Sequence, residues 1–114
     1  MTNLTKISII IPVLNEASTI KTALAIVQAA SNVEVIVVDG GSEDETVAIA
    51  KSLNVKVLFS PPGRAHQMNI GAAAATGDIL LFLHADTRLP DSFDTMIRQA
   101  LQADKPIQNP KSSS

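Results

Sequence analysis

Residues 33–46 constrain the fold more than any other stretch, and they read Val-Glu-Val-Ile-Val-Val-Asp-Gly-Gly-Ser-Glu-Asp-Glu-Thr. Residues 35–38 are β-branched with no polar alternation, which predicts a strand buried on both faces, as in a parallel sheet covered by helices. The acid and two glycines at 39–41 then allow a sharp turn. Ser42 and Glu45 have the spacing of a capping box, so a helix is expected to follow at once. Together these features predict a site for a small molecule that carries hydrogen-bond donors and phosphate.

The same alternation of strand and helix recurs along the chain. The expected strands are residues 7–13, 35–39, 55–59 and 78–84, and the expected helices are 16–30, 43–53, 64–75 and 90–103. Helical spacing predicts these inward-facing residues: Ile20, Leu24, Val27, Val47, Ala50, Leu53, Ala65, Met68, Ala72, Ala75, Phe93, Ile97, Ala100 and Leu101. Asn15 is the expected N-cap of the first helix, and Gly77 is the expected C′ residue of the third. This order predicts one α/β domain over residues 1–103, with a parallel sheet and right-handed crossovers. Residues 104–114 are expected to form a disordered tail.

Composition excludes several classes of function. The 114 residues carry 9 Lys and Arg against 11 Asp and Glu without a basic cluster, so no nucleic-acid partner is expected. Cysteine is absent and no signal peptide precedes the first strand, which fits a cytoplasmic location. The apolar run 79–83 is too short to span a bilayer. The chain is 46% hydrophobic with three aromatic residues, so homo-oligomerisation through exposed apolar surface is expected.

Polar residues follow each expected strand. Because ligands bind at the carboxyl edge of open α/β sheets, these residues are expected to share one rim. They are Asn15, Glu16, Asp39, Gly41, Ser42, Arg64, His84 and Asp86. The chain lacks Gly-x-Gly-x-x-Gly after its first strand, which argues against a dinucleotide-binding Rossmann site, and it lacks the P-loop pattern altogether.

Two acids of this rim each have two interpretations. Asp39 either accepts a hydrogen bond from a base or sugar or caps the turn through its own backbone. The residues alone favour neither interpretation. Asp86 suits Mg²⁺ or Mn²⁺, and His84 lies two positions before it on an extended segment. Taken alone, the favoured interpretation is that Asp86 begins a turn before Pro90 while His84 ends a strand.

The segment after the third strand offers a cation. Arg64 follows Ser-Pro-Pro-Gly, so stiff backbone presents its guanidinium near a helix start, in a position suited to a diphosphate. A solitary arginine is more often solvated surface. His66, Gln67 and Asn69 lie close behind it and either line the site or face water.

As a set, four segments resemble the family 2 glycosyltransferases of the GT-A fold. They are Ile-Ile-Ile-Pro-Val-Leu-Asn-Glu, Val-Ile-Val-Val-Asp-Gly-Gly-Ser-Glu-Asp-Glu-Thr, Gly-Arg-Ala-His-Gln-Met-Asn-Ile-Gly-Ala and Gly-Asp-Ile-Leu-Leu-Phe-Leu-His-Ala-Asp-Thr. The resemblance covers residues 7–103 with the motifs in order. It implies the Rossmann-like nucleotide-binding half of a GT-A domain, with a four-stranded parallel sheet of order 3-2-1-4 flanked by helices.

The resemblance also implies an inverting transferase that uses a nucleotide-diphosphate sugar, commonly a UDP-sugar, with Mg²⁺ or Mn²⁺. The acceptor is not identified. By this resemblance Asp39 accepts from the uracil ring, while Asp86, with His84 beside it, holds the metal. The other implied nucleotide-sugar contacts are Pro12, Asn15, Glu16, Gly41, Ser42, Asp44, Arg64 and Asn69.

The chain departs from the family pattern in two ways. The Asp-x-Asp signature is here His84-Ala85-Asp86, which leaves one carboxylate. Family members also continue for roughly another hundred residues, which supply the acceptor site and the general base. We therefore expect a truncated glycosyltransferase that is inactive alone. One alternative is a non-catalytic remnant that binds nucleotides or self-associates. A second is a nucleotidyltransferase, which is disfavoured because the loop after the first strand is not rich in glycine and lysine.

Overall fold

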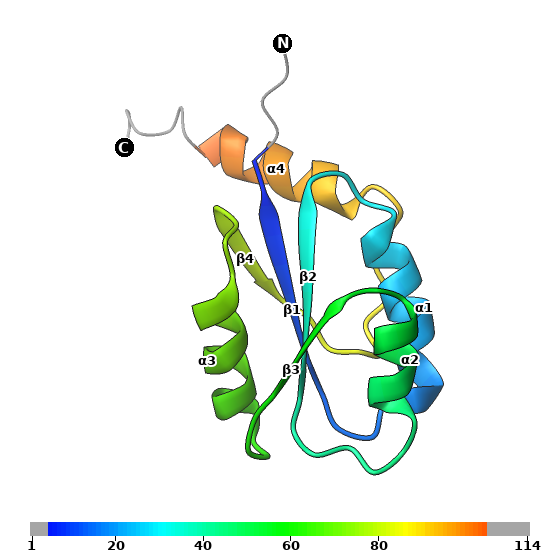
Figure 1. The fold of residues 1–114 in the computed structure, drawn as a ribbon. Coiled ribbons are helices and arrows are strands. Elements are labelled where there is room, and N and C mark those ends of the chain that lie inside the picture. The colour runs from blue at the N-terminus through cyan, green and yellow to red at the C-terminus, as the bar shows by residue number, and fades with distance from the viewer. Residues whose placement is uncertain (1–4, 105–114) are drawn as a thin grey trace.

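The computed structural model describes residues 5–104 and contains the predicted four strand–helix units (Figure 1). The elements are β1 (Ile7–Val13), α1 (Ala17–Gln28), β2 (Val33–Asp39), α2 (Thr46–Ser52), β3 (Lys56–Phe59), α3 (Arg64–Ala74), β4 (Ile79–Phe82) and α4 (Phe93–Asp104). Of the predicted tail, Asp104 instead ends α4, and residues 105–114 lie outside the described part of the chain. None of the helices within residues 5–104 has the length and apolar character of a membrane span.

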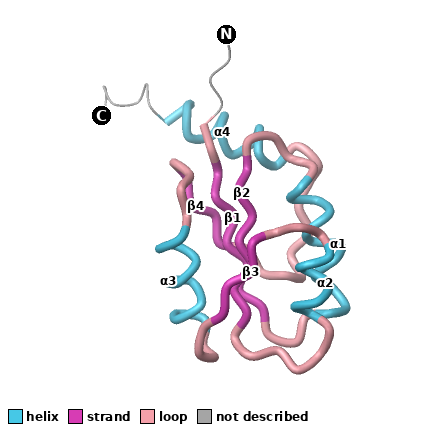
Figure 2. The backbone as a smooth tube through the Cα atoms, in the orientation of Figure 1, coloured by secondary structure: helices cyan, strands magenta, loops and turns pink. Residues whose placement is uncertain are grey.

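The four strands form one parallel sheet in the order β3-β2-β1-β4, which confirms the predicted fold class. Val13 pairs with Asp39, and Asp39 pairs with Phe59, so the three strands end level with one another. Figure 2 shows the loops that follow these strands at the same end of the sheet. The carboxyl rim predicted from the sequence is therefore a real edge of the molecule.

Helices cover the two faces of the sheet unequally (Figure 1). Alternate residues of β1 from Ile7 to Val13 face α1 and α2 and form the larger core, to which α1 contributes Ile20, Leu24 and Val27 as predicted. On the opposite face, Ile10 and its neighbours on β2 pack against α3. Because α3 alone covers that face, apolar side chains near the β4 edge stay exposed there.

The predicted inward face of α3 was right in part, because Ala72 and Ala75 pack against the core of Ile10, Ile36 and Val38. Gln67 and Gly71 are the buried residues of α3, whereas Ala65 is exposed. A Cβ on Gly71 would lie 2.4 Å from Cγ2 of Ile10, so the missing side chain is what lets α3 approach β1. Gly77 is not the C′ residue either, because Ala75 caps the helix in an extended conformation.

Helix α4 crosses the end of the sheet where β1 and β2 begin, away from the rim (Figure 1). Phe93 is buried as predicted, but Ala100 and Leu101 are exposed rather than inward. The guanidinium of Arg98 fixes this position by donating to the carbonyl oxygens of Thr5 and Ser31 at 2.7 and 2.8 Å.

Candidate functional site

The loops that follow β1 and β2 are joined by hydrogen bonds through Asn15. Its side-chain oxygen accepts from the backbone N–H of Glu43 at 2.8 Å, and its own N–H donates to the hydroxyl of Ser42 at 2.8 Å. The predicted N-cap role of Asn15 was therefore wrong, because Glu16 occupies that position and Asn15 has a positive φ of 55°. The capping box was also wrong, since the Ser42 hydroxyl is bound to the other loop and α2 begins only at Thr46.

A second set of contacts, around Asp44, fixes the starts of α1 and α2. The carboxylate of Asp44 accepts from the N–H and hydroxyl of Thr46 and from the N–H of Ala17 at 3.2 Å. The N–H of Glu16 donates to the Thr46 hydroxyl at 2.8 Å. The hydrogen bond from the Thr46 hydroxyl lowers the pKa of Asp44 most, followed by the bond from the Thr46 N–H. The two loops thus form one rigid wall of the rim.

Asp39 lies at the centre of the rim with one carboxylate oxygen in use and one free. Oδ2 accepts from the N–H groups of Gly41 and Ser42 at 2.9 and 3.0 Å, which the positive φ of Gly41 permits. Oδ1 is buried, and among the side chains that the structure describes, in residues 5–101, it is the only nitrogen or oxygen atom that is both buried and without a hydrogen-bond partner. A buried carboxylate oxygen without a partner is costly, and a ligand that donates to it removes the cost.

Gln67 of α3 lies beneath the loop that follows β2 and is buried. The sequence left open whether this side chain lines the site or faces water. Its Nε2 donates to the carbonyl oxygens of Val13 and Val38, both at 2.9 Å, and so joins the ends of β1 and β2. Gly40 lies directly over it, because a Cβ there would come within 2.9 Å of the Gln67 amide carbon. The helical spacing of apolar residues gave no signal for this buried amide.

Arg64 and His84 meet on the α3 side of the rim. Nη1 of Arg64 lies 3.0 and 2.6 Å from the two ring nitrogens of His84. With Pro12 they line a small pocket of about 80 Å³. Asn69 is exposed on the same helix, about 7 Å further along its axis. The predicted cation is thus exposed but hydrogen-bonded to the segment that follows β4.

Asp86 and His84 line different pockets. Asp86 lines a pocket of about 110 Å³ with the hydroxyl-bearing residues Ser18, Thr19 and Thr22 of α1. Arg88 lines the same pocket, and Asp86 is its only acid. Among the side chains that the structure describes, residues 5–101 contain no cluster of three His, Cys, Asp or Glu. Oxygen donors of this kind fit Mg²⁺ or Mn²⁺ provided that ligand phosphates complete the shell.

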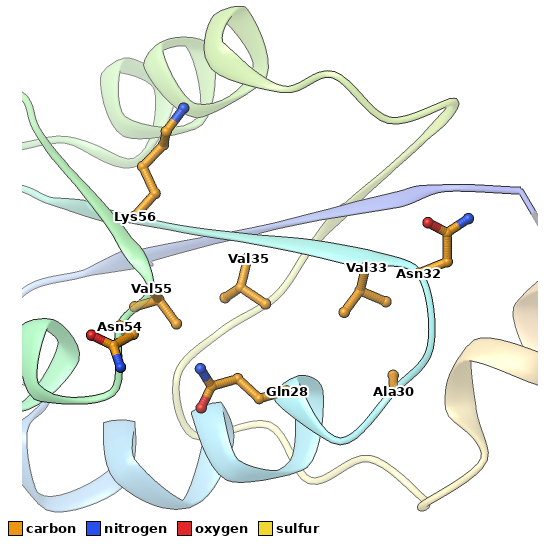
Figure 3. Close-up of a pocket in the computed structure, with 8 residues that line it drawn as sticks. All are labelled: Gln28, Ala30, Asn32, Val33, Val35, Asn54, Val55 and Lys56. Carbon is orange, nitrogen blue, oxygen red and sulfur yellow. The ribbon is translucent and has the colours of Figure 1, made fainter.

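A larger pocket of about 340 Å³ lies elsewhere, beside the starts of β2 and β3 (Figure 3). It forms because Lys56 pairs with Ile36, so the first three residues of β2 extend beyond β3. Gln28 borders it and donates to the carbonyl oxygen of Leu53 at 2.7 Å. The pocket is thus a gap between elements at the opposite end of β2 from Asp39.

Comparison with known proteins decides the family. The sequence model of Glycosyl transferase family 2 matches residues 8–109. The chain belongs to this family. A glycosyltransferase of PGL/p-HBAD biosynthesis from Mycobacterium bovis is 39% identical over 102 residues, 82% of this chain and 40% of that protein. This family 2 chain therefore spans about 40% of the length of such relatives.

Solved structures agree with the family assignment. Glucosyl-3-phosphoglycerate synthase from Mycobacterium tuberculosis, in complex with Mn²⁺, UDP-glucose and phosphoglyceric acid, matches with a TM-score of 0.77 at 28% identity, covering 90% of this chain and 41% of that one. A mannosyltransferase from Pyrobaculum calidifontis, in complex with GDP-mannose and Mn²⁺, matches at 0.74 and 25% identity, covering 93% and 34%. The fold of this family 2 chain is thus that of GT-A glycosyltransferases.

Proposed function

We propose that this chain is the donor-binding part of an inverting glycosyltransferase, and that it binds a nucleotide-diphosphate sugar, a UDP-sugar, with Mg²⁺ or Mn²⁺. The observation that carries the proposal is the buried, unpartnered Oδ1 of Asp39 at the centre of the rim. A uracil ring presents an N–H that can donate to this oxygen. The similar synthase that was solved with UDP-glucose and Mn²⁺ supports the choice of donor and cation.

The diphosphate would lie between Arg64 and Asp86. Pro12 and Arg64 offer one side of this space, and the pocket of Asp86 with its α1 hydroxyls offers the other. A cation held by Asp86 would supply Lewis-acid stabilisation of the departing diphosphate. The guanidinium of Arg64, oriented by His84, would offset the same developing charge by hydrogen bonding. Asn15, Glu16, Gly41, Ser42 and Asp44 shape the wall beside the nucleotide, and Asn69 would approach the sugar.

Donor binding, and not sugar transfer, is the activity proposed for this chain by itself. An inverting displacement needs a general base poised near the working pH to take the proton of the acceptor hydroxyl. None of the rim residues is proposed as this base, because each is assigned to the nucleotide, the diphosphate or the cation. We therefore expect no detectable transfer or hydrolysis. A non-catalytic nucleotide-binding protein is the second candidate. Detectable transfer by this chain would exclude that candidate, and it would also show that a general base is present.

The Asp39→Asn variant tests donor binding. Asparagine keeps an oxygen for the N–H groups of Gly41 and Ser42 but replaces the free oxygen with an N–H₂ donor. If Asp39 accepts from the base, calorimetry with UDP and Mn²⁺ will show affinity about 10- to 100-fold weaker, the usual effect of losing a charged hydrogen bond. If Asp39 only caps its turn, the affinity will hardly change.

Glu45→Gln is the matched control, because it removes the same charge from an exposed residue that makes no capping bond. It should bind UDP as the parent chain does. Asp86→Ala should weaken binding in Mn²⁺ and have no effect when the metal is chelated. If Asp86→Ala weakens UDP binding equally with and without the metal, Asp86 is not a metal ligand. If the parent chain does not bind UDP, the proposal is overturned.

A further inference from the structure

Gln67 is a buried amide in the first turn of α3. Its Nε2 carries two hydrogens and makes two bonds, to the carbonyl oxygen of Val13 on β1 and to that of Val38 on β2, each at 2.9 Å. Burying a polar group has a cost that an apolar side chain of the same size avoids. The two bonds offset this cost only while the ends of β1 and β2 stay in place.

These bonds fix the backbone on both sides of Asp39. The carbonyl oxygen of Val38, in the peptide that precedes Asp39, accepts from Gln67 directly. The N–H of Gly40, in the peptide that follows, donates at 3.0 Å to the Val13 carbonyl oxygen that Gln67 also holds. With both peptide planes fixed, the direction of the Cα–Cβ bond of Asp39 is fixed as well. Gln67 thus constrains the carboxylate through the backbone.

Two glycines make room for the amide of Gln67. Gly71, one turn along the same face of α3, lets the helix approach β1, because a Cβ there would meet Ile10. Gly40 lies over the amide, and a Cβ there would lie 2.9, 3.0 and 3.1 Å from three of the amide atoms. Gly40 does not have a positive φ, so its backbone does not itself require glycine. The amide of Gln67 is what excludes a side chain at this position.

We propose that Gln67 is a positioning residue of the donor site, which holds Asp39 so that its free Oδ1 meets the base of the nucleotide. This role rests on the proposed function, since the base is what Oδ1 would bind. A methionine would fill the same space without donating, and a glutamate would turn carboxylate oxygens toward two carbonyl oxygens. A site already held in its binding geometry gains affinity, because less freedom is lost on binding.

Gln67→Met tests this role, because methionine has a similar length but no hydrogen to donate. Val13 keeps its bond from Gly40, so the fold should survive. Calorimetry with UDP and Mn²⁺ should show affinity about 10-fold weaker, as expected for a misplaced hydrogen bond to a charged group, whereas pyrophosphate with Mn²⁺, which has no base, should bind as before. Gln28→Met is the matched control, because it removes the same kind of bond, to the carbonyl oxygen of Leu53, away from the rim. It should bind UDP as the parent chain does.

A double-mutant cycle separates positioning from a merely structural role. If Gln67 acts through Asp39, Gln67→Met should change the UDP affinity of the Asp39→Asn variant by less than about twofold, because the bond it supports is already lost. Full additivity, or equal weakening of pyrophosphate binding, would overturn the proposal. Unchanged UDP affinity in folded Gln67→Met, while Asp39→Asn weakens it, would overturn the proposal and leave the proposed function intact. A parent chain that does not bind UDP would overturn both.

Gly40→Ala reaches the same amide from the other side, and it decides the outcome if Gln67→Met does not fold. The added Cβ would displace the Gln67 amide, so UDP should again bind about 10-fold more weakly while pyrophosphate binding stays unchanged. Circular dichroism checks that each variant is folded. If Gly40→Ala is folded and binds UDP as the parent chain does, Gln67 does not position Asp39.

Discussion

Glu34 is a single carboxylate that ties three segments together at the end of the sheet remote from Asp39. Its Oε1 accepts from the Ser8 hydroxyl at 2.6 Å and from the N–H and hydroxyl of Thr76 at 2.9 and 3.2 Å. The Ser8 hydroxyl in turn accepts from the N–H of Gly77 at 2.8 Å. These bonds position the turn that leads into β4.

The same bonds predict an acid dependence of stability. The bond from Ser8, followed by that from the Thr76 backbone, lowers the pKa of Glu34 in the folded chain. Its contribution is therefore complete above the unfolded pKa of about 4.3 and is lost as the pH falls through the lower folded value. Glu34→Gln should be less stable than the parent at pH 7, and urea unfolding should show this difference shrinking towards pH 3. A constant difference would contradict the assignment. Glu43→Gln, which removes an exposed carboxylate, should have no such effect.

Residue patterns predicted the place of the site residues but not their bonds. Asp39 and Asn15 lie on the rim because parallel strands end together, which follows from the order of apolar runs. The capping box at Ser42 and the N-cap at Asn15 failed because each side chain is used by the other loop, a contact between segments that no local rule contains. For Gln67 the sequence left open whether it lines the site or faces water, because a polar residue on a helix is normally solvent-facing.

At the scale of elements, the packing of α3 on β1 depends on Gly71. An added Cβ would meet Cγ2 of Ile10 at 2.4 Å and Cγ2 of Val38 at 3.1 Å. Glycine to alanine inside a helix ordinarily stabilises it by about 1 kcal/mol. Here overpacking should dominate, and Gly71→Ala should lower the free energy of unfolding by about 1–3 kcal/mol in urea titration. Ala73→Ser, exposed on the same helix, should change it by less than about 0.5 kcal/mol. A stabilised Gly71→Ala variant would refute this account.

The elements themselves were largely predictable, and the errors share one cause. Strong apolar periodicity located β1, α1 and β2 to within a few residues. The inward faces of α3 and α4 were right in part, since Ala72, Ala75, Phe93 and Ile97 pack against the core whereas Ala65, Ala100 and Leu101 are exposed. Periodicity reports that a helix has an apolar face, but it does not report how much surface is available to cover that face.

At the scale of the whole molecule, helix α4 and the candidate site lie at opposite ends of the sheet. Arg98 forms an ion pair with Asp94 at 3.0 Å and donates to the carbonyl oxygens of Thr5, Ser31 and Asn32, so α4 clamps the ends where β1 and β2 begin. Both side chains of the pair are about nine-tenths buried. The proposed donor site lies at the far ends of the same strands.

This separation predicts that Arg98→Met weakens the fold without weakening donor binding. Removing one partner of a buried pair leaves an uncompensated charge on Asp94 and should cost about 3 kcal/mol, and in a domain of this size that lowers the Tm by more than about 10 °C. Lys21→Met removes an exposed cation and should leave the Tm nearly unchanged. At a temperature where all three proteins are folded, the Kd for UDP should be the same. A weaker Kd for Arg98→Met alone would mean that α4 influences the rim through β1 and β2, and that the two ends are coupled rather than independent.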